Sequence, residues 1–167
     1  MDMTTSPATN ALQPLQQDVQ RLLGRCLLRL QQYERLMKAI VAHHEISGPA
    51  HSLEALRAAR IEDAATKTLG TLVGQLFGSY VVTDGNGGKE RDDDLPGDVI
   101  SFRTRVQLSL SAQDYAKTQA DLKDLVSLRN TLVHHFIDQH DLWTVDGCRA
   151  AQDELGSAYT RIDQHFE

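Results

Sequence analysis

The stretch Leu122–Ile137 reads LKDLVSLRNTLVHHFI, and the spacing of its apolar residues decides the fold that we predict. A helix turns by about 100° per residue, so these apolar side chains share an arc of roughly 180°. Just upstream, Ser111 and Asp114 resemble a capping box with Asp in place of the usual Glu or Gln. The pattern predicts one helix from about residue 112 to about residue 139. The apolar residues on its arc are Leu122, Leu125, Val126, Leu128, Leu132, Val133, Phe136 and Ile137.

Arg129 lies inside this apolar arc, where a permanent cation is unusual. Asn130 and His134 share one flank of the helix, four residues apart, and His135 points to the other flank. Arg129 and His134 lie well over a right angle apart on a regular helix, so we expect a single chain to bring them together poorly.

Structural explanations also exist for the three residues. Arg129 is either functional or a member of a buried ion pair with Glu34 or Asp121. A histidine near a helix C-terminus, such as His134, interacts favourably with the helix dipole. For Asn130 the alternative is a surface position without a role.

A long amphipathic helix is predicted from Leu12 to Val41, because its apolar residues recur at three-four spacing. Residues 1 to 10 are polar, and we expect a disordered tail there. We interpret the arginines on the polar face of this helix as solvated residues rather than as a surface that binds RNA. These are Arg21, Arg25, Arg29 and Arg35.

A second helical region is predicted from Ser52 to Tyr80, after a terminating Ser47-Gly48-Pro49. Gly70, Gly74 and Gly78 follow at four-residue spacing within it. Because glycine costs about 1 kcal/mol inside a helix, we expect this row to permit the close approach of another helix.

Residues 100–110 alternate between apolar and polar side chains, which predicts one extended segment that either pairs with Val81-Val82 or drapes over the helices. Residues 83–98 have the composition of a mobile loop. A last helix is expected from about Asp146, with Trp143 as a lid over the end of the bundle. The residues it is expected to bury are Cys148, Ala151, Leu155, Ala158, Ile162 and Phe166.

Together these elements predict an all-α protein, a helical bundle of four to five helices with one short extended segment. At 167 residues, the chain is the size of one domain, which we expect to span 11–167. The chain stops at Glu167 without a residue that terminates a helix, so we expect it to be a piece of a longer protein.

Composition limits the class of function. The formal net charge of −6 argues against nonspecific nucleic-acid binding through a broad basic surface, though not against a local basic patch. We find no signal peptide and no apolar run long enough for a membrane span, so we expect a cytoplasmic protein without membrane partners. Cys26 and Cys148 occupy apolar helical positions and are expected to be buried free thiols.

No metal or other cofactor is expected. The aspartates at 92–94 lack the ligand spacing of a calcium loop. No pair of histidines has convincing zinc spacing. We expect five histidines to be solvated surface residues: His43, His44, His51, His140 and His165.

Arg129, Asn130 and His134 form an Arg-Asn-x-x-x-His motif on a helix late in the chain, and this motif resembles the signature of the HEPN superfamily. The resemblance implies a compact helical bundle, a metal-independent ribonuclease and a homodimer in which two motifs line one cleft. Many such proteins act as toxins or antiviral effectors, so an antitoxin or other protein partner is also implied.

The wider sequence looks like the N-terminal region of bacterial proteins that carry a C-terminal OST-HTH (LOTUS) RNA-binding domain. This similarity rests on residues 23–26, 68–73 and 128–136. It implies an alternative function, namely a catalytically inactive dimerisation or RNA-associated module of a longer protein.

The motif residues suit RNA cleavage by transesterification. His134 supplies an acid or base near neutral pH, since the unperturbed pKa of histidine is about 6.5. Arg129 holds phosphate through a forked pair of hydrogen bonds, and Asn130 orients His134 or contacts the phosphate. Further RNA-contact candidates are Arg103 and Arg105 on the extended segment and, more weakly, His135.

Overall fold

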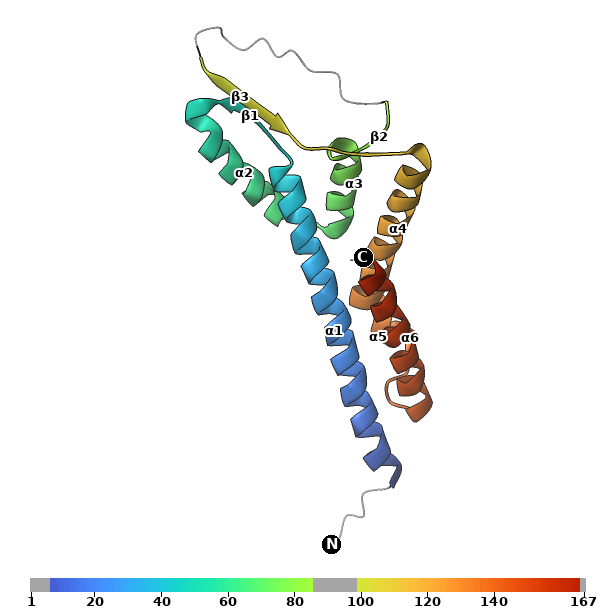
Figure 1. Cartoon of the computed structure of the whole chain (residues 1–167). Coiled ribbons are helices and arrows are strands. Elements are labelled where there is room, and N and C mark those ends of the chain that lie inside the picture. The colour runs from blue at the N-terminus through green and yellow to red at the C-terminus, as the bar shows by residue number, and fades with distance from the viewer. Residues whose placement is uncertain (1–6, 86–98, 166–167) are drawn as a thin grey trace. The chain divides into compact units, whose positions relative to one another are not determined.

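The computed structural model describes residues 7–85 and 99–165, and it is mainly helical (Figure 1). Its contacts divide the chain into two compact units. The terminal unit combines the residues up to Gln32 with those from Asp124 onward, and the central unit spans Tyr33–Lys123. Two helices contribute to both units, α1 (Pro7–His43) and α4 (Ala112–Asn130). A single domain over 11–167 stays a prediction.

The terminal unit ends in a series of short helical elements. After α4 come a π-helical turn, η2 (Thr131–His135), a short α5 (Phe136–Gln139) and the long α6 (Val145–Gln164). The Thr144 hydroxyl accepts a hydrogen bond from Gly147 N at 3.1 Å and caps α6, close to the predicted start. The expected inward face of α6 is confirmed, except that Phe166 lies outside the described residues. The buried residues of this helix are Cys148, Ala151, Leu155, Ala158 and Ile162.

α1 packs along α6 through both apolar and polar contacts. Cys26 is fully buried and donates from Sγ to Leu155 O at 3.5 Å, so the predicted buried free thiol is confirmed. Arg29 pairs with Asp163 at 2.7 Å, and the Arg25 guanidinium lies 4.6 Å from the centre of the Tyr159 ring. These two arginines therefore contact α6; Arg25 is exposed, as expected for a solvated face, whereas Arg29 is half-buried.

In the central unit, the predicted helical region from Ser52 to Tyr80 is two helices, α2 (Leu53–Ala65) and α3 (Leu69–Ser79), preceded by the 3-10 turn η1 (Ala50–Ser52). The break occurs because Thr68 caps a new helix, accepting from Thr71 N at 3.4 Å. Among the described residues, an added Cβ at Gly74 or Gly78 would meet nothing within 4 Å. The expectation that this glycine row admits another helix is therefore wrong at both positions.

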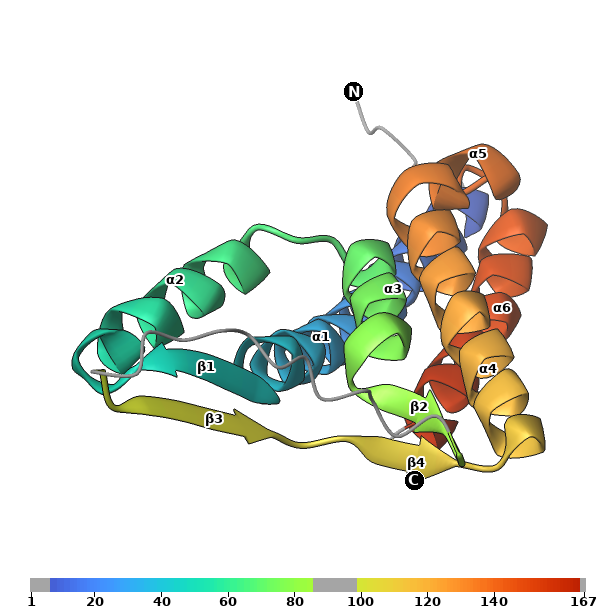
Figure 2. The ribbon, with the colours of Figure 1, turned by 90° about the horizontal axis from the view of Figure 1, so that it is seen from above.

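Four short strands replace the one extended segment that we expected. β1 (Glu45–Pro49) pairs antiparallel with β3 (Ser101–Arg105), and β2 (Val81–Thr83) pairs parallel with β4 (Leu108–Leu110). The expected pairing with Val81-Val82 is confirmed. Figure 2 shows β3 and β4 following one another along one edge of the central unit. β1 was missed because Ser47-Gly48-Pro49 has the composition of a turn.

Parts of two predictions lie outside the described residues. Of the loop expected at 83–98, residues 86–98 are not described, whereas Thr83 belongs to β2. Of the expected tail, residues 1–6 are not described, and residues 7–10 are helical. No helix in the described part of the chain is both long enough and apolar enough to cross a membrane.

Candidate functional site

The motif residues lie where α4 passes into the π-helical turn η2. On a regular α-helix, two residues five positions apart lie about 140° from one another. A π-helix forms i→i+5 hydrogen bonds instead, so residues five apart come onto the same side. The turn therefore moves His134 toward Arg129. Single π-turns within α-helices occur frequently at functional sites.

The Arg129 guanidinium joins the other two motif residues. Its Nη1 donates to Asn130 Oδ1 at 3.2 Å and lies 3.3 Å from His134 Nε2. Because a guanidinium has donors and no acceptor, His134 Nε2 is the acceptor and carries a lone pair. The expectation that one chain assembles these residues poorly was wrong, because it assumed a regular α-helix.

The site lies on the surface and is anchored from beneath. Arg129 is half-buried, whereas Asn130 and His134 are exposed. Within the same turn and just after it, Leu132 and Phe136 are 3% and 2% exposed. The buried side chains fix the backbone of the π-turn, and the polar ones face solvent.

Two apolar residues of the predicted arc are exposed. Val133 is 44% exposed and Ile137 is 78% exposed. The prediction failed here because the period of 100° per residue does not hold through the π-turn. Val133 and Ile137 are therefore exposed apolar residues close to the motif along the helix.

Within the described residues of its own unit, Arg129 has no ion pair, and its two candidate partners have cations of their own unit beside them. Glu34 pairs with Lys38 at 2.7 Å, and Asp121 pairs with Lys117 at 2.8 Å. Both bonds recorded for Arg129 use Nη1. The Nε–H and Nη2–H groups are thus left for a further acceptor.

His135 lies closer to the motif than expected. Its ring centroid is 6.3 Å from that of His134, and the ring planes meet at 66°. Both imidazoles are exposed. The narrower rotation per residue in a π-turn accounts for their proximity.

Arg103 and Arg105 belong to the central unit, whereas the motif residues belong to the terminal unit. Arg103 Nε donates to Ser47 Oγ at 3.3 Å. Arg105 Nη2 donates to Ser79 O at 3.3 Å, and its Nε lies 3.8 Å from Glu45 Oε2. These bonds attach β3 to β1 and to the end of α3.

Trp143 is 82% exposed, so its predicted role as a lid was wrong. It belongs to a tight turn in which its N–H donates to Asp141 Oδ1 at 3.1 Å. Together with Ile137 and Gln16 it lines a cavity of about 550 Å³ in the terminal unit. His140 lies on the same wall with its Nε2 3.0 Å from Glu154 Oε2, and its side chain is 8% exposed rather than solvated as predicted.

In the described residues, no three His, Cys, Asp or Glu side chains lie close enough together to hold a metal ion. Comparison of the chain with protein-family models, with curated proteins and with solved structures gives no match.

Proposed function

We propose that the chain is a metal-independent endoribonuclease of the HEPN type. It cleaves RNA by attack of a ribose 2′-hydroxyl group of the RNA on the neighbouring phosphate. The observation that carries this proposal is the 3.3 Å contact between Arg129 Nη1 and His134 Nε2. It places a cation for phosphate beside a nitrogen lone pair that accepts a proton, and both are accessible on the surface.

The chemistry assigns one role to each side chain. His134 Nε2 takes the proton from the ribose 2′-hydroxyl, whose oxygen attacks the adjacent phosphorus. A new bond between the 2′ oxygen and phosphorus forms, and the bond from phosphorus to the 5′ oxygen breaks. The leaving 5′ oxygen takes a proton from an acid. The products carry a 2′,3′-cyclic phosphate and a 5′-hydroxyl.

Arg129 stabilises the charge that develops on the phosphorane. Its Nε–H and Nη2–H groups form the planar fork that matches two phosphate oxygens. Asn130 Oδ1 holds Nη1 and restricts the guanidinium, and Nη1 releases His134 Nε2 when that nitrogen takes the 2′-hydroxyl proton. A fixed fork loses less entropy on binding phosphate than a freely rotating side chain does.

One imidazole rarely serves as both acid and base, so a second one is needed. His134 of a second copy is the source that the HEPN resemblance implies. His135 of the same chain is the other source, because its ring is 6.3 Å from that of His134. A homodimer formed over this face would also cover the exposed Val133 and Ile137.

The biological setting follows from the resemblance. We propose a cytoplasmic RNA substrate and a role in a toxin–antitoxin, defence or RNA-regulation system, with an antitoxin as a possible class of protein partner. The alternative is a catalytically inactive module that dimerises and supports an OST-HTH domain. The exposure of Asn130 and His134 favours this alternative, because closed active sites that expel water strengthen the electrostatic interactions inside them.

A product assay separates the two functions. Single-stranded RNA is incubated with the chain in EDTA, and the ends of the fragments are identified by mass spectrometry. Cyclic phosphate and 5′-hydroxyl ends support the ribonuclease. A folded chain that leaves the RNA intact supports the inactive module.

A further inference from the structure

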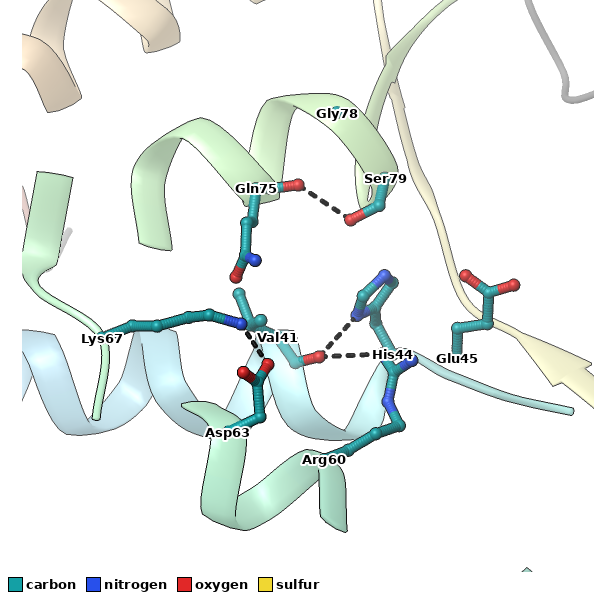
Figure 3. A pocket seen from close by; sticks show the side chains of 9 residues that line it. All are labelled: Val41, His44, Glu45, Arg60, Asp63, Lys67, Gln75, Gly78 and Ser79. Atoms are coloured by element: carbon teal, nitrogen blue, oxygen red, sulfur yellow. Dashed lines mark hydrogen bonds and ion pairs between the residues drawn. The ribbon is translucent and has the colours of Figure 1, made fainter. Parts of the chain in front are cut away.

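The central unit contains a second polar site, a cavity of about 380 Å³ lined by the C-terminal end of α1, by α2 and by α3 (Figure 3). None of its residues belongs to the Arg129 motif. Seven charged or polar side chains line it: His44, Glu45, Arg60, Asp63, Lys67, Gln75 and Ser79.

His44 is 7% exposed, so its expected place on the solvated surface is wrong. Its Nδ1 lies 3.1 Å from Ile40 O and 3.1 Å from Val41 O. Carbonyl oxygens only accept, so Nδ1 carries the hydrogen and Nε2 of the neutral ring holds a lone pair. The ring is further fixed by Tyr80, whose centroid is 5.9 Å away with the planes at 83°.

Two buried acceptors on this wall have no hydrogen-bond partner in the described part of the chain. They are His44 Nε2 and Gln75 Oε1. Figure 3 shows the two side chains extending toward the same space from the end of α1 and from α3. More than nine in ten buried polar groups are normally paired, so two unpaired acceptors around one cavity indicate a ligand that supplies the donors.

The cations of the wall already have partners. Arg60 donates to Ala42 O at 3.1 Å and to Val41 O at 3.0 Å, where it caps the C-terminal carbonyls of α1. Lys67 is paired with Asp63. These contacts hold both cations in the frame of the cavity; Lys67 is neutralised by Asp63, whereas Arg60 is held by uncharged carbonyls.

The carboxylate of the wall that is only loosely paired is that of Glu45. Glu45 Oε2 lies 3.8 Å from Arg105 Nε, and the Glu45 side chain is 33% exposed. The cavity therefore offers two unpaired acceptors and a weakly neutralised carboxylate. A ligand that complements this set carries several N–H donors and a positive charge.

We propose that this cavity binds a small organic cation with an amidinium or guanidinium head. The head donates to His44 Nε2 and Gln75 Oε1, and its charge faces Glu45. This inference does not depend on the ribonuclease activity.

The test uses butylguanidine and butylurea, two probes of similar shape of which only the first is charged. Titration calorimetry with the full chain should show saturable binding of butylguanidine and at least tenfold weaker binding of butylurea. The ¹⁵N resonance of His44 Nε2 should shift as the cation binds, because that nitrogen gains a donor.

Gln75→Leu removes the acceptor and keeps a side chain of similar size. It should bind butylguanidine at least tenfold more weakly, because a hydrogen bond to a charged group is lost, while its thermal midpoint stays level or rises. Gln113→Leu, at an exposed position of α4, is the matched control and should bind as the wild type does. Three results would overturn the proposal: no saturable binding of butylguanidine at millimolar concentration, equal binding of the two probes, or unchanged binding in folded Gln75→Leu.

Discussion

Arg129 Nη1 lies 3.3 Å from His134 Nε2, although five positions of a helix separate the two residues. A regular α-helix would hold them about 140° apart. The π-turn from Thr131 to His135 brings them together, and buried Leu132 and Phe136 hold that turn in place. The candidate site is therefore a consequence of one local departure from α-helical geometry.

Arg129→Met should abolish RNA cleavage while changing the free energy of unfolding by less than about 0.5 kcal/mol, because no carboxylate in the described chain depends on this arginine. Urea denaturation followed by circular dichroism measures the stability. Leu132→Ala is the contrasting control, since Leu132 is 3% exposed and its truncation should cost about 2–5 kcal/mol. A large loss of stability in Arg129→Met would instead assign the arginine a structural role.

Asn130→Asp should leave the fold intact and slow cleavage about tenfold or more, because a carboxylate beside Arg129 competes with phosphate for the guanidinium. The substitution keeps the shape of the side chain and the acceptor that now binds Nη1 at 3.2 Å. Asn130→Ala, which removes the acceptor without adding charge, should be less impaired. Single-turnover kinetics compares the two variants, and an Asp variant as active as the wild type would be inconsistent with phosphate binding by Arg129.

Stability should fall at alkaline pH through the Cys26 thiol. Burial raises the pKa of Cys26 above its ordinary value of 9.0, with Arg25 opposing the shift. The folded state therefore favours the neutral thiol, whereas the unfolded chain ionises first as the pH rises. The contribution of this group is complete below pH 9.0 and is lost above it, up to the raised pKa.

Urea denaturation between pH 7 and pH 10 measures this decline. The range ends at the ordinary pKa of 10.0 for Tyr33, because burial raises the pKa of Tyr33 as well and its ionisation would add to the decline at higher pH. Cys26→Ala should have a lower free energy of unfolding at neutral pH and a shallower decline above pH 9.0. An identical alkaline decline in both proteins would show that the thiol does not carry it.

Two glycines of α6 should respond in opposite directions to alanine. A Cβ on Gly147 would clash with Asp141 O in the turn that caps the helix, and we expect a loss of about 1–3 kcal/mol. A Cβ on Gly156 would meet nothing within 4 Å, and alanine there should gain about 0.5–1 kcal/mol. Thermal unfolding of the two variants tests the described turn, and equal effects would contradict it.

The sequence predicted the elements whose cause is local. Ser111 Oγ accepts from Asp114 N at 3.1 Å and donates to Asp114 Oδ2 at 2.8 Å, so the start of α4 was recognisable from the pattern. The inward positions of α6 followed in the same way from a regular period, which the fully buried Cys148 and Leu155 illustrate.

The sequence did not predict the features that depend on tertiary packing. No residue pattern marks the π-turn, which shifts the positions around the helix that we predicted for the side chains after Asn130. His44 resembled a surface histidine because its burial depends on carbonyls of α1 and on Tyr80, which is distant in the sequence. Trp143 was expected to be a lid over the end of the bundle, although it lies in an exposed turn.

The most direct test of the central claim is cleavage of single-stranded RNA in EDTA by matched variants. Arg129→Ala and His134→Ala are compared with Arg149→Ala and His43→Ala, which replace exposed residues outside the motif. If Arg129 and His134 carry the chemistry, the wild type and both control variants cut the RNA, and both motif variants lose at least about a hundredfold in rate. Cutting that survives in folded Arg129→Ala or His134→Ala, or no cutting by the folded wild type, would contradict it.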